Sequence, residues 1–281
     1  MINNIDKPKP FLKWAGGKRW FVDSYSHLIP AKFNNYYEPF LGAGSIFFYL
    51  TPKAAQLSDI NPELINTYSA LKEDHVKVKR RLCFHNRMHS TEHYYKIRAA
   101  TKGGQFSKAG DFIYLNRTCW NGLYRVNRKG KFNVPIGDRA SILREDDCFN
   151  LISSALSNSE LKVACFSKAL KSVSNGDFCF IDPPYTVKHD YNGFVRYNEK
   201  LFSWESQVEL RDIVVSIKDS GGMALVLNAN HSSIQELYKG VGKIVSLSRN
   251  SMLAAKPQYR GDTKEIAILV GYDPINGGQL G

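Results

Sequence analysis

The chain has 281 residues, and its 43% hydrophobic and 23% charged residues are typical of a globular protein with a sizeable core. No apolar run approaches the roughly 18 residues that a membrane-spanning helix needs. The N-terminal segment MINNIDKPKP lacks the apolar stretch of a signal peptide. These features argue against a membrane-spanning or secreted protein, and we expect a cytoplasmic location.

The positive charge is concentrated in one stretch. The formal net charge is +12, from 38 basic and 26 acidic side chains. Between Lys77 and Arg144 there are 16 basic residues against only Glu92, Asp111 and Asp138, so this stretch carries +13 and the remainder is close to neutral. A neutral body with one strongly basic segment is typical of a protein that binds a polyanion.

Neither a metal site nor a disulfide framework is expected. The cysteines are odd in number, are widely spaced and form no CxxC pair, which favours reduced thiols. They are Cys83, Cys119, Cys148, Cys165 and Cys179. Three histidines recur at every fourth position, His85, His89 and His93, and this predicts a solvated or DNA-facing helix face rather than a metal site.

In chain order, the first elements predict a parallel sheet. Residues 36–40 form a short strand that ends at a glycine-rich turn, and the apolar run IFFYL begins a helix. A second strand covers 56–60, and a helix over 61–73 starts with Asn61 as its cap and Pro62 in its first turn. This β-α-β-α order is that of a sheet with crossover helices.

The alternation then stops and resumes. Residues 75–120 have a helical pattern with basic faces, 121–137 resemble a hairpin with its turn near 127–131, and a helix covers 145–157. Strands follow at 161–165, 177–182, 223–228, 243–249 and 264–272, with a helix at 204–219. We therefore predict a catalytic domain formed by residues 1–74 and 151–281, interrupted by an inserted recognition domain over 75–150.

The segment FCFIDPPY, residues 178–185, carries the chemistry. Its apolar strand delivers Asp182 to the carboxyl end of the sheet, where α/β proteins place their sites. Pro183 and Pro184 fix the backbone and remove two N–H donors, which leaves carbonyl oxygens as acceptors. A carboxylate and a carbonyl can together accept both hydrogens of an exocyclic amino group, and Tyr185 offers a flat face for a base. The pattern therefore predicts alkylation at an amino nitrogen.

Three further segments fit a nucleoside ligand. In EPFLGAGS, Gly42 allows close approach to the backbone, and Phe47 stands where a dinucleotide-binding motif would have its third glycine. Asp59 ends the second strand and can accept hydrogen bonds from ribose hydroxyls, although it could instead cap the helix that follows. In FLKWAGGKR, Trp14 and Lys18 flank a tight bend and can cover a ligand that carries a sulfonium and a carboxylate, although Trp14 could instead fill the core.

These segments, in this order, resemble the Dam-type DNA adenine-N6 methyltransferases, with their FxGxG motif, target-recognition insert and DPPY motif. The resemblance covers about 11–272 and is most specific in YLNRTCWNGLYRVNRKGKFNVP. It implies an α/β fold: a Rossmann-like S-adenosylmethionine-dependent methyltransferase sheet with an inserted helical target-recognition domain that bears a β-hairpin. It also implies S-adenosylmethionine as cofactor, double-stranded DNA as partner, no metal, and base flipping of adenine.

The resemblance and the motifs together give the site residues that we expect. The catalytic residues are Asp182, Pro183, Pro184 and Tyr185. The cofactor-binding residues are Trp14, Lys18, Glu38, Pro39, Phe40, Gly42, Asp59 and Asp182. The DNA-binding residues are Lys13, Asn116, Arg117, Trp120, Asn121, Leu123, Arg125, Asn127, Lys131 and Arg139. Arg125 would read a guanine through its O6 and N7 atoms, and Leu123 would be an apolar contact or wedge.

The sequence departs from the family at one point. Many members that act on GATC continue as FNVPxGRYK after the hairpin, whereas this chain has FNVPIGDRAS, with Asp138 and Arg139 in place of a basic and an aromatic residue. GATC is the expected target, and the guanine read by Arg125 is its best-supported position. A cytosine-N4 methyltransferase and a DNA-binding regulator with an inactive methyltransferase fold are the alternatives. We expect a monomer in solution, and a cognate restriction endonuclease is a candidate partner.

Overall fold

The structure is a computed structural model, and it describes residues 7–100, 103–127, 130–138, 141–187, 202–250 and 262–274. Within these ranges the strands form one seven-stranded sheet in the order β3-β2-β1-β4-β5-β7-β6. The strands are β1 (Tyr36–Glu38), β2 (Ala55–Asp59), β3 (Ser159–Val163), β4 (Phe178–Ile181), β5 (Met223–Ala229), β6 (Lys243–Asn250) and β7 (Asp262–Val270). This confirms the predicted α/β class.

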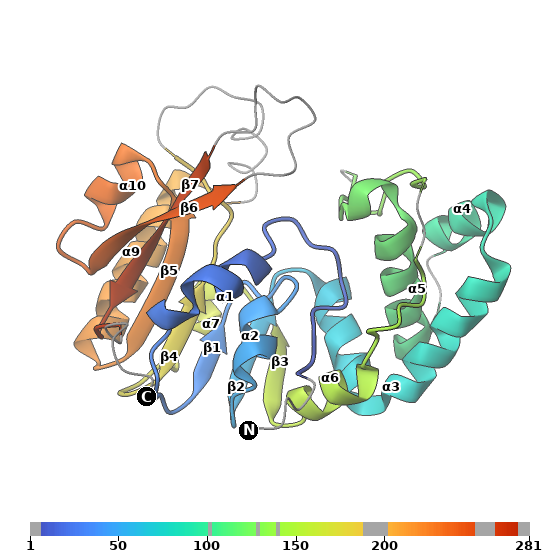
Figure 1. The fold of residues 1–281 in the computed structure, drawn as a ribbon, viewed down its shortest axis with the longest axis horizontal. Coiled ribbons are helices and arrows are strands. Elements are labelled where there is room, and N and C mark those ends of the chain that lie inside the picture. Colours follow the sequence, from blue (N-terminus) through green and yellow to red (C-terminus); the bar gives the residue numbers. More distant parts are fainter. Residues whose placement is uncertain are drawn as a thin grey trace. The chain divides into compact units, whose positions relative to one another are not determined.

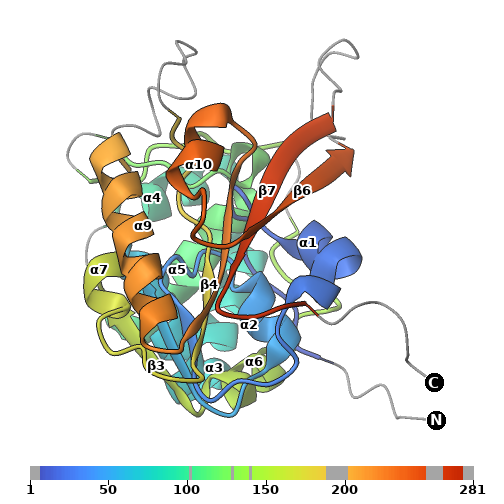
Figure 2. The same ribbon diagram turned by 90° about the vertical axis from the view of Figure 1, so that its left-hand side faces the viewer.

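The pairing explains the apolar strand sequences. Strand β4 lies parallel to β1 and to β5, with Phe180 opposite Leu225 in the latter pair. All four residues of β4 are buried, as expected for a central parallel strand that is covered on both faces. Strand β7 pairs antiparallel with both β5 and β6. The last two strands, β6 and β7, therefore form an antiparallel pair, with β6 at the edge of the sheet (Figure 2).

The chain divides into two compact units. The first comprises residues 1–22, 41–53 and 57–163, and the second comprises 23–40, 54–56 and 164–281. These units do not follow the predicted boundaries at residues 75 and 150, because the helices and strand that flank the predicted insert belong to the same unit as the insert. The inserted recognition domain stays a prediction.

The first unit is mainly helical (Figure 1). Its helices are α2 (Ser45–Leu50), α3 (Pro62–Met88), α4 (Thr91–Ala99), α5 (Gln105–Thr118) and α6 (Phe149–Leu156). The predicted helix over 61–73 continues through α3 across a non-helical residue, Asp74, with φ −154° and ψ 85°. Asn61 caps α3 by accepting from the backbone N–H groups of Glu63 and Leu64, as its position predicts.

The predicted hairpin follows α5 in the first unit. A short 3-10 helix, η2 (Trp120–Gly122), leads into two isolated antiparallel bridges, Cys119 with Ile136 and Val126 with Phe132. Asn127 closes the turn, because its N–H donates to the carbonyl of Lys131 at 2.8 Å. The structure therefore confirms a hairpin at the predicted position, although its isolated bridges do not extend into regular β-strands.

The second unit packs helices on the parallel strands. The helices are α7 (Phe166–Ala169), α9 (Trp204–Asp219) and α10 (Ser232–Leu237), while α1 (Arg19–Tyr25) begins in the first unit and is followed by a 3-10 turn, η1 (Ser26–Leu28). Ser203 caps α9 by accepting from the N–H of Ser206 at 3.2 Å. Helix α9 covers β5 and buries Leu210, Val214 and Ile217 in the same core as Val226 of the strand. In the described ranges, no helix is long and apolar enough to cross a membrane.

Candidate functional site

The Asp182–Tyr185 segment follows β4 at its carboxyl end. Because β4 and β1 are parallel neighbours, the residues after each strand emerge at the same edge of the sheet. Asp182 is partly exposed there, Pro183 is buried, and Tyr185 is partly exposed. The predicted amino-acceptor motif therefore begins where an open α/β sheet places its ligand sites.

Tyr185 is held by two carboxylates. Its hydroxyl lies 3.3 Å from Oδ1 of Asp182, and it donates a hydrogen bond to Oε2 of Glu265 on β7. Glu265 is 5% exposed. Burial raises the pKa of the Tyr185 hydroxyl well above its ordinary value, and the neighbouring negative charges of Asp182 and Glu265 raise it further. The hydroxyl is therefore a proton donor at neutral pH.

A buried polar network supports the turn after Tyr185. The hydroxyl of Thr186 donates to the carbonyl of Phe202 at 2.6 Å. Gln207 on α9 donates to the Thr186 carbonyl at 3.5 Å and accepts from the Asn228 amide at 3.1 Å. Gln207 and Asn228 are both fully buried. Their bonds tie the end of the motif to α9 and β5, which fixes the position of the tyrosine.

The residues that follow β1 are largely enclosed. Glu38 is buried and accepts from the Tyr36 hydroxyl at 2.7 Å, and burial raises the pKa of that hydroxyl well above its ordinary value. Pro39 is also buried. Phe40 is half-buried and stacks on Phe166 with ring centroids 5.8 Å apart. Of these three expected cofactor contacts, Phe40 is thus the one most accessible to a ligand.

Gly42 and Trp14 form a close pair in the first unit. Gly42 has φ 47°, and a Cβ at this position would lie 2.9 Å from Cδ1 of the Trp14 indole. A side chain is therefore excluded by both space and backbone conformation. The Gly42 carbonyl accepts from the Tyr68 hydroxyl at 3.0 Å, which holds the loop against α3. The role of Gly42 and Trp14 in holding a nucleoside stays a prediction.

Asp59 is positioned by the same loop. Its carboxylate accepts from the N–H of Gly42 at 3.2 Å and from the N–H of Asn61 at 3.0 Å. Burial raises the pKa of Asp59, while these backbone hydrogen bonds oppose the rise. Because Asn61 caps α3 with its own side chain, Asp59 is not that cap. Its role as a ribose acceptor stays a prediction.

Trp14 has a partner that the sequence did not reveal. Its indole stacks on Tyr124 of the hairpin, with centroids 5.3 Å apart and planes inclined by 24°. Tyr124 also contacts Phe112 of α5 and Phe132 across the hairpin. Lys18 is 5% exposed, and its ammonium donates to the carbonyl of Gly16 at 2.8 Å. The bend between Trp14 and Lys18 is thus closed, and the indole links the Gly42 loop with the hairpin.

The hairpin presents exposed side chains. Trp120 is 54% exposed, and Leu123 and Asn121 are also exposed. Asn121 has φ 54°, a left-handed conformation that asparagine tolerates, and Gly122 follows with φ 66°. A Cβ on Gly122 would lie 2.4 Å from the Lys13 side chain, so this turn accepts only glycine. Trp120 and Leu123 therefore lie on the surface, as expected for residues that meet DNA.

Arg125 is exposed and is steadied across the hairpin. Its Nε donates to the side-chain oxygen of Asn133 at 2.9 Å. This bond does not use the two terminal guanidinium nitrogens, which form the fork that suits guanine O6 and N7. Lys131 and Asn127 are exposed as well, and Asn127 also accepts from the N–H of Lys131 at 3.1 Å. Arg139 lies outside the described residues.

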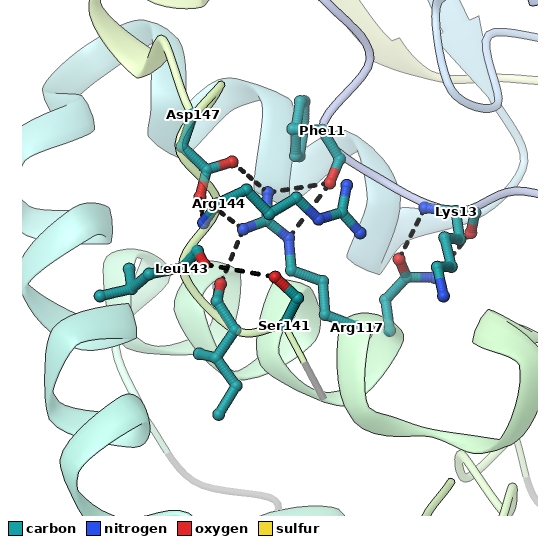
Figure 3. A network of polar contacts seen from close by, with 9 residues as sticks. Phe11, Lys13, Arg117, Ser141, Leu143, Arg144 and Asp147 are labelled. Carbon is teal, nitrogen blue, oxygen red and sulfur yellow. Dashed lines mark hydrogen bonds and ion pairs between the residues drawn. The ribbon is translucent and has the colours of Figure 1, made fainter. Parts of the chain in front are cut away.

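Two expected DNA contacts are corrected, because Asn116 and Arg117 are buried, at 2% and 1% exposure. Asn116 accepts from the N–H of Lys13 at 2.9 Å and donates to its carbonyl at 2.7 Å, while the Lys13 side chain is exposed. Arg117 forms a two-pronged ion pair with Asp147, with both N–O distances 2.6 Å (Figure 3). It also donates to the carbonyls of Phe11 and Ile142. These two buried side chains support the end of α5 that leads into the hairpin, and together with Asp147 they are called the platform.

The expected histidine face is also corrected. His85 is fully buried, stacks on Tyr114 with centroids 4.4 Å apart, and contacts Asp111 at 2.8 Å. Helix α3 ends at Met88, so His93 belongs to the next helix and meets His85 at 2.9 Å. The histidine spacing thus reflects packing between helices rather than a surface facing DNA.

Comparison with known proteins decides the family. Residues 14–252 match the D12 class N6 adenine-specific DNA methyltransferases. The chain belongs to this family. As a D12 class methyltransferase, it transfers a methyl group to the N6 amino group of adenine in DNA, and S-adenosylmethionine is the cofactor that this class implies. The alternatives of cytosine-N4 modification and of an inactive regulator are set aside by this assignment.

This D12 class methyltransferase is similar over most of its length to type II methyltransferases and to a DNA adenine methylase. It is 35% identical to the type II methyltransferase M1.LlaDCHI of Lactococcus lactis subsp. cremoris, covering 92% of this chain and 94% of the relative. It is 30% identical to the type II methyltransferase M.MjaIII of Methanocaldococcus jannaschii, covering 94% and 99%. It is 29% identical to the DNA adenine methylase of Haemophilus influenzae, covering 94% of each chain.

Sequence reasoning about this D12 class methyltransferase missed two residues of the site, Glu265 and Tyr124. Glu265 lies 80 residues after its partner Tyr185, and only the strand order brings β7 within reach of the motif. A weak signal existed, since a lone glutamate in the otherwise apolar run EIAILV is unusual for a buried strand. Tyr124 lies in the most specific segment of the sequence, but no spacing there indicates that its ring meets Trp14.

Proposed function

We propose that this D12 class methyltransferase modifies adenine within a short duplex sequence, GATC, whose guanine is read by Arg125. The observation that supports the chemistry is the Asp182–Tyr185 segment at the carboxyl end of β4 beside β1. The observation that supports the reading of guanine is the Arg125–Asn133 bond, which orients an exposed guanidinium on the hairpin.

The amino group of the target adenine would be held by two acceptors. The Asp182 carboxylate and the Pro183 carbonyl together accept both N6 hydrogens, which draws the nitrogen lone pair out of conjugation with the ring and directs it outward. Tyr185 stacks on the base, and the Thr186 network keeps that ring in place. The proton leaves after the nitrogen has been alkylated, so no prior base is required. Catalysis would rest on positioning and fixed charges.

The cofactor would be held by the loop of the first unit. S-adenosylmethionine supplies an electrophilic methyl group when bound. Gly42 leaves its backbone bare beside the Trp14 indole, which fits an adenosine moiety. Asp59 would accept from ribose hydroxyls, and Lys18 would lie near the carboxylate end. Phe40, which is half-buried, would add an aromatic face. Glu38, Pro39 and Asp182 complete the proposed set.

The target base would leave the helical stack, because N6 of a stacked adenine is inaccessible to a pocket. Exposed apolar side chains on the hairpin, Trp120 and Leu123, are suited to the space that the flipped base leaves. Basic side chains of the same segment, Lys131 among them, would contact phosphates and set the register. Lys13, Asn121, Asn127 and Arg139 stay proposed DNA contacts.

We further propose that the protein acts as a monomer. Two relatives bear the name type II methyltransferase, which supports a cognate restriction endonuclease as a functional partner of this chain.

Methylation-sensitive sequencing of DNA from cells that express this chain tests the target. We expect modified adenines at GATC, with a guanine directly before each one. Modified adenines without a constant neighbouring guanine would contradict the assignment to Arg125. Modification at a different guanine-containing sequence would retain Arg125 and reject GATC, and Asp138 would then be the first position to examine.

A further inference from the structure

Two carboxylates compete for one proton beside the amino-acceptor motif. The Tyr185 hydroxyl has a single hydrogen to donate, and it contacts both Oδ1 of Asp182, at 3.3 Å, and Oε2 of Glu265. The contact with Asp182 is longer than an ordinary O–H···O hydrogen bond, whereas Glu265 is a hydrogen-bonded partner of the hydroxyl. The geometry therefore assigns the Tyr185 proton to the hydrogen bond with Glu265, and Asp182 is not the main acceptor of that proton.

Glu265 is fixed for this task. It lies within β7, opposite Ala229 of β5 and Leu247 of β6, so hydrogen-bonded strands flank it on both sides. Its side chain is 5% exposed in a run that is otherwise buried and apolar. A buried carboxylate in a central strand is costly unless a strong donor satisfies it, and the Tyr185 hydroxyl is such a donor.

We infer that Glu265 is a positioning residue of the methyl-transfer site, which takes the Tyr185 proton and so keeps Asp182 an acceptor for the adenine amino group. This inference rests on the role proposed above for Asp182. Without the Glu265 carboxylate, the hydroxyl turns to Asp182 and occupies the oxygen that the substrate needs. The raised pKa of Tyr185 is consistent with this arrangement, because the hydroxyl keeps its proton throughout.

The test is an epistasis experiment with four variants: Glu265→Gln, Tyr185→Phe, the two combined, and Asp182→Ala. In Glu265→Gln the amide is a weaker acceptor and can itself donate to the hydroxyl oxygen, so the Tyr185 proton turns to Asp182. We expect its kcat to fall on the order of tenfold or more, with little change in the KM for DNA. The kcat of the combined variant should match that of Tyr185→Phe alone and exceed that of Glu265→Gln, because Tyr185→Phe has no hydroxyl that could turn to Asp182.

Controls separate the possible causes. Glu236→Gln changes an exposed glutamate on α10 and should leave kcat unaltered. Glu265→Ala, which removes the acceptor completely, should show the same rescue by Tyr185→Phe if the isosteric variant folds poorly. A wild-type kcat in Glu265→Gln would overturn the inference. So would a kcat that stays below that of Tyr185→Phe when Tyr185→Phe is combined with Glu265→Gln and with Glu265→Ala. Near-normal methylation by Asp182→Ala would instead overturn the proposed function.

Discussion

At the scale of single residues, burial distinguishes two arginines of the basic stretch. Arg125 is exposed and oriented by Asn133, whereas Arg117, eight positions earlier, is enclosed by Asp147 and two carbonyls. Both arginines belong to the same basic segment, and the sequence placed both on DNA. Only their burial distinguishes a side chain that can meet a base from one that holds the platform.

Replacing Arg125 by alanine should relax sequence discrimination at one guanine. The loss of a bidentate base contact costs about 1–3 kcal/mol at that position, while phosphate contacts are retained. Methylation rates on duplexes that differ only at this guanine measure the effect. Lys131→Ala is the matched control, since it should weaken binding to all duplexes alike. An Arg125→Ala variant that still discriminates fully would place guanine recognition elsewhere.

At the scale of elements, one aromatic stack joins the Gly42 loop to the hairpin. Trp14 lies against Gly42 on one side and Tyr124 on the other, and Tyr124 in turn contacts α5 and the second arm of the hairpin. The loop proposed to bind the cofactor and the hairpin proposed to read DNA are thus in contact within the first unit.

Removing this stack should weaken cofactor binding without DNA present. Tyr124→Ala leaves the Trp14 indole without its stacked partner, and such ring pairs contribute about 0.5–1.5 kcal/mol, which is roughly a 2- to 13-fold change in Kd. Calorimetry with S-adenosylmethionine measures the effect. Tyr124→Phe keeps the ring and should bind close to the wild type. Equal affinities for the alanine and wild-type proteins would show that the stack does not support the cofactor loop.

The platform under the hairpin should be a stability determinant. Arg117→Met leaves Asp147 buried without its two-pronged partner, and an uncompensated buried charge costs about 3–5 kcal/mol. Urea unfolding should show a free energy of unfolding lowered by that amount, whereas Lys131→Met, at an exposed position, should remain within about 0.5 kcal/mol of the wild type. If Arg117→Met unfolds like the wild type but loses DNA binding, the original expectation of a DNA contact is restored.

At the scale of the whole molecule, charge predicts how DNA is found. The net charge of +12 comes from the stretch between Lys77 and Arg144, and part of it is used internally, as in the pairs Arg81–Asp111 and Arg117–Asp147. Nonspecific DNA binding should therefore weaken steeply with salt, as counterions are displaced from phosphates.

The slope of log affinity against log salt measures that contribution. Lys131→Ala should reduce the slope by about 0.9, the value of one phosphate contact. Lys162→Ala changes an exposed lysine outside the basic stretch, which pairs with Glu160, and should leave the slope unchanged. Equal slopes for the two variants would mean that the basic stretch does not face DNA.

The fold was largely predictable because its signals are local. Apolar strands, the Asn61 cap and the helix over 204–219 each follow from nearby residues. The pairing of β7 between β5 and β6 depends on contacts distant in sequence, and so does the meeting of Glu265 with Tyr185. The same limit explains Arg117, since its partners Phe11 and Asp147 lie 106 and 30 residues away. Motifs identify chemistry, while burial is set by the assembled chain.

The most direct test of the account is methyl transfer by wild-type protein and the Asp182→Ala variant, on duplex DNA with a labelled methyl donor. Digestion to nucleosides followed by mass spectrometry identifies and counts the modified base. We expect labelled N6-methyladenine from the wild type and none from Asp182→Ala, with DNA binding retained by the variant. Labelled N6-methyladenine formed at a near-normal rate by Asp182→Ala would contradict it.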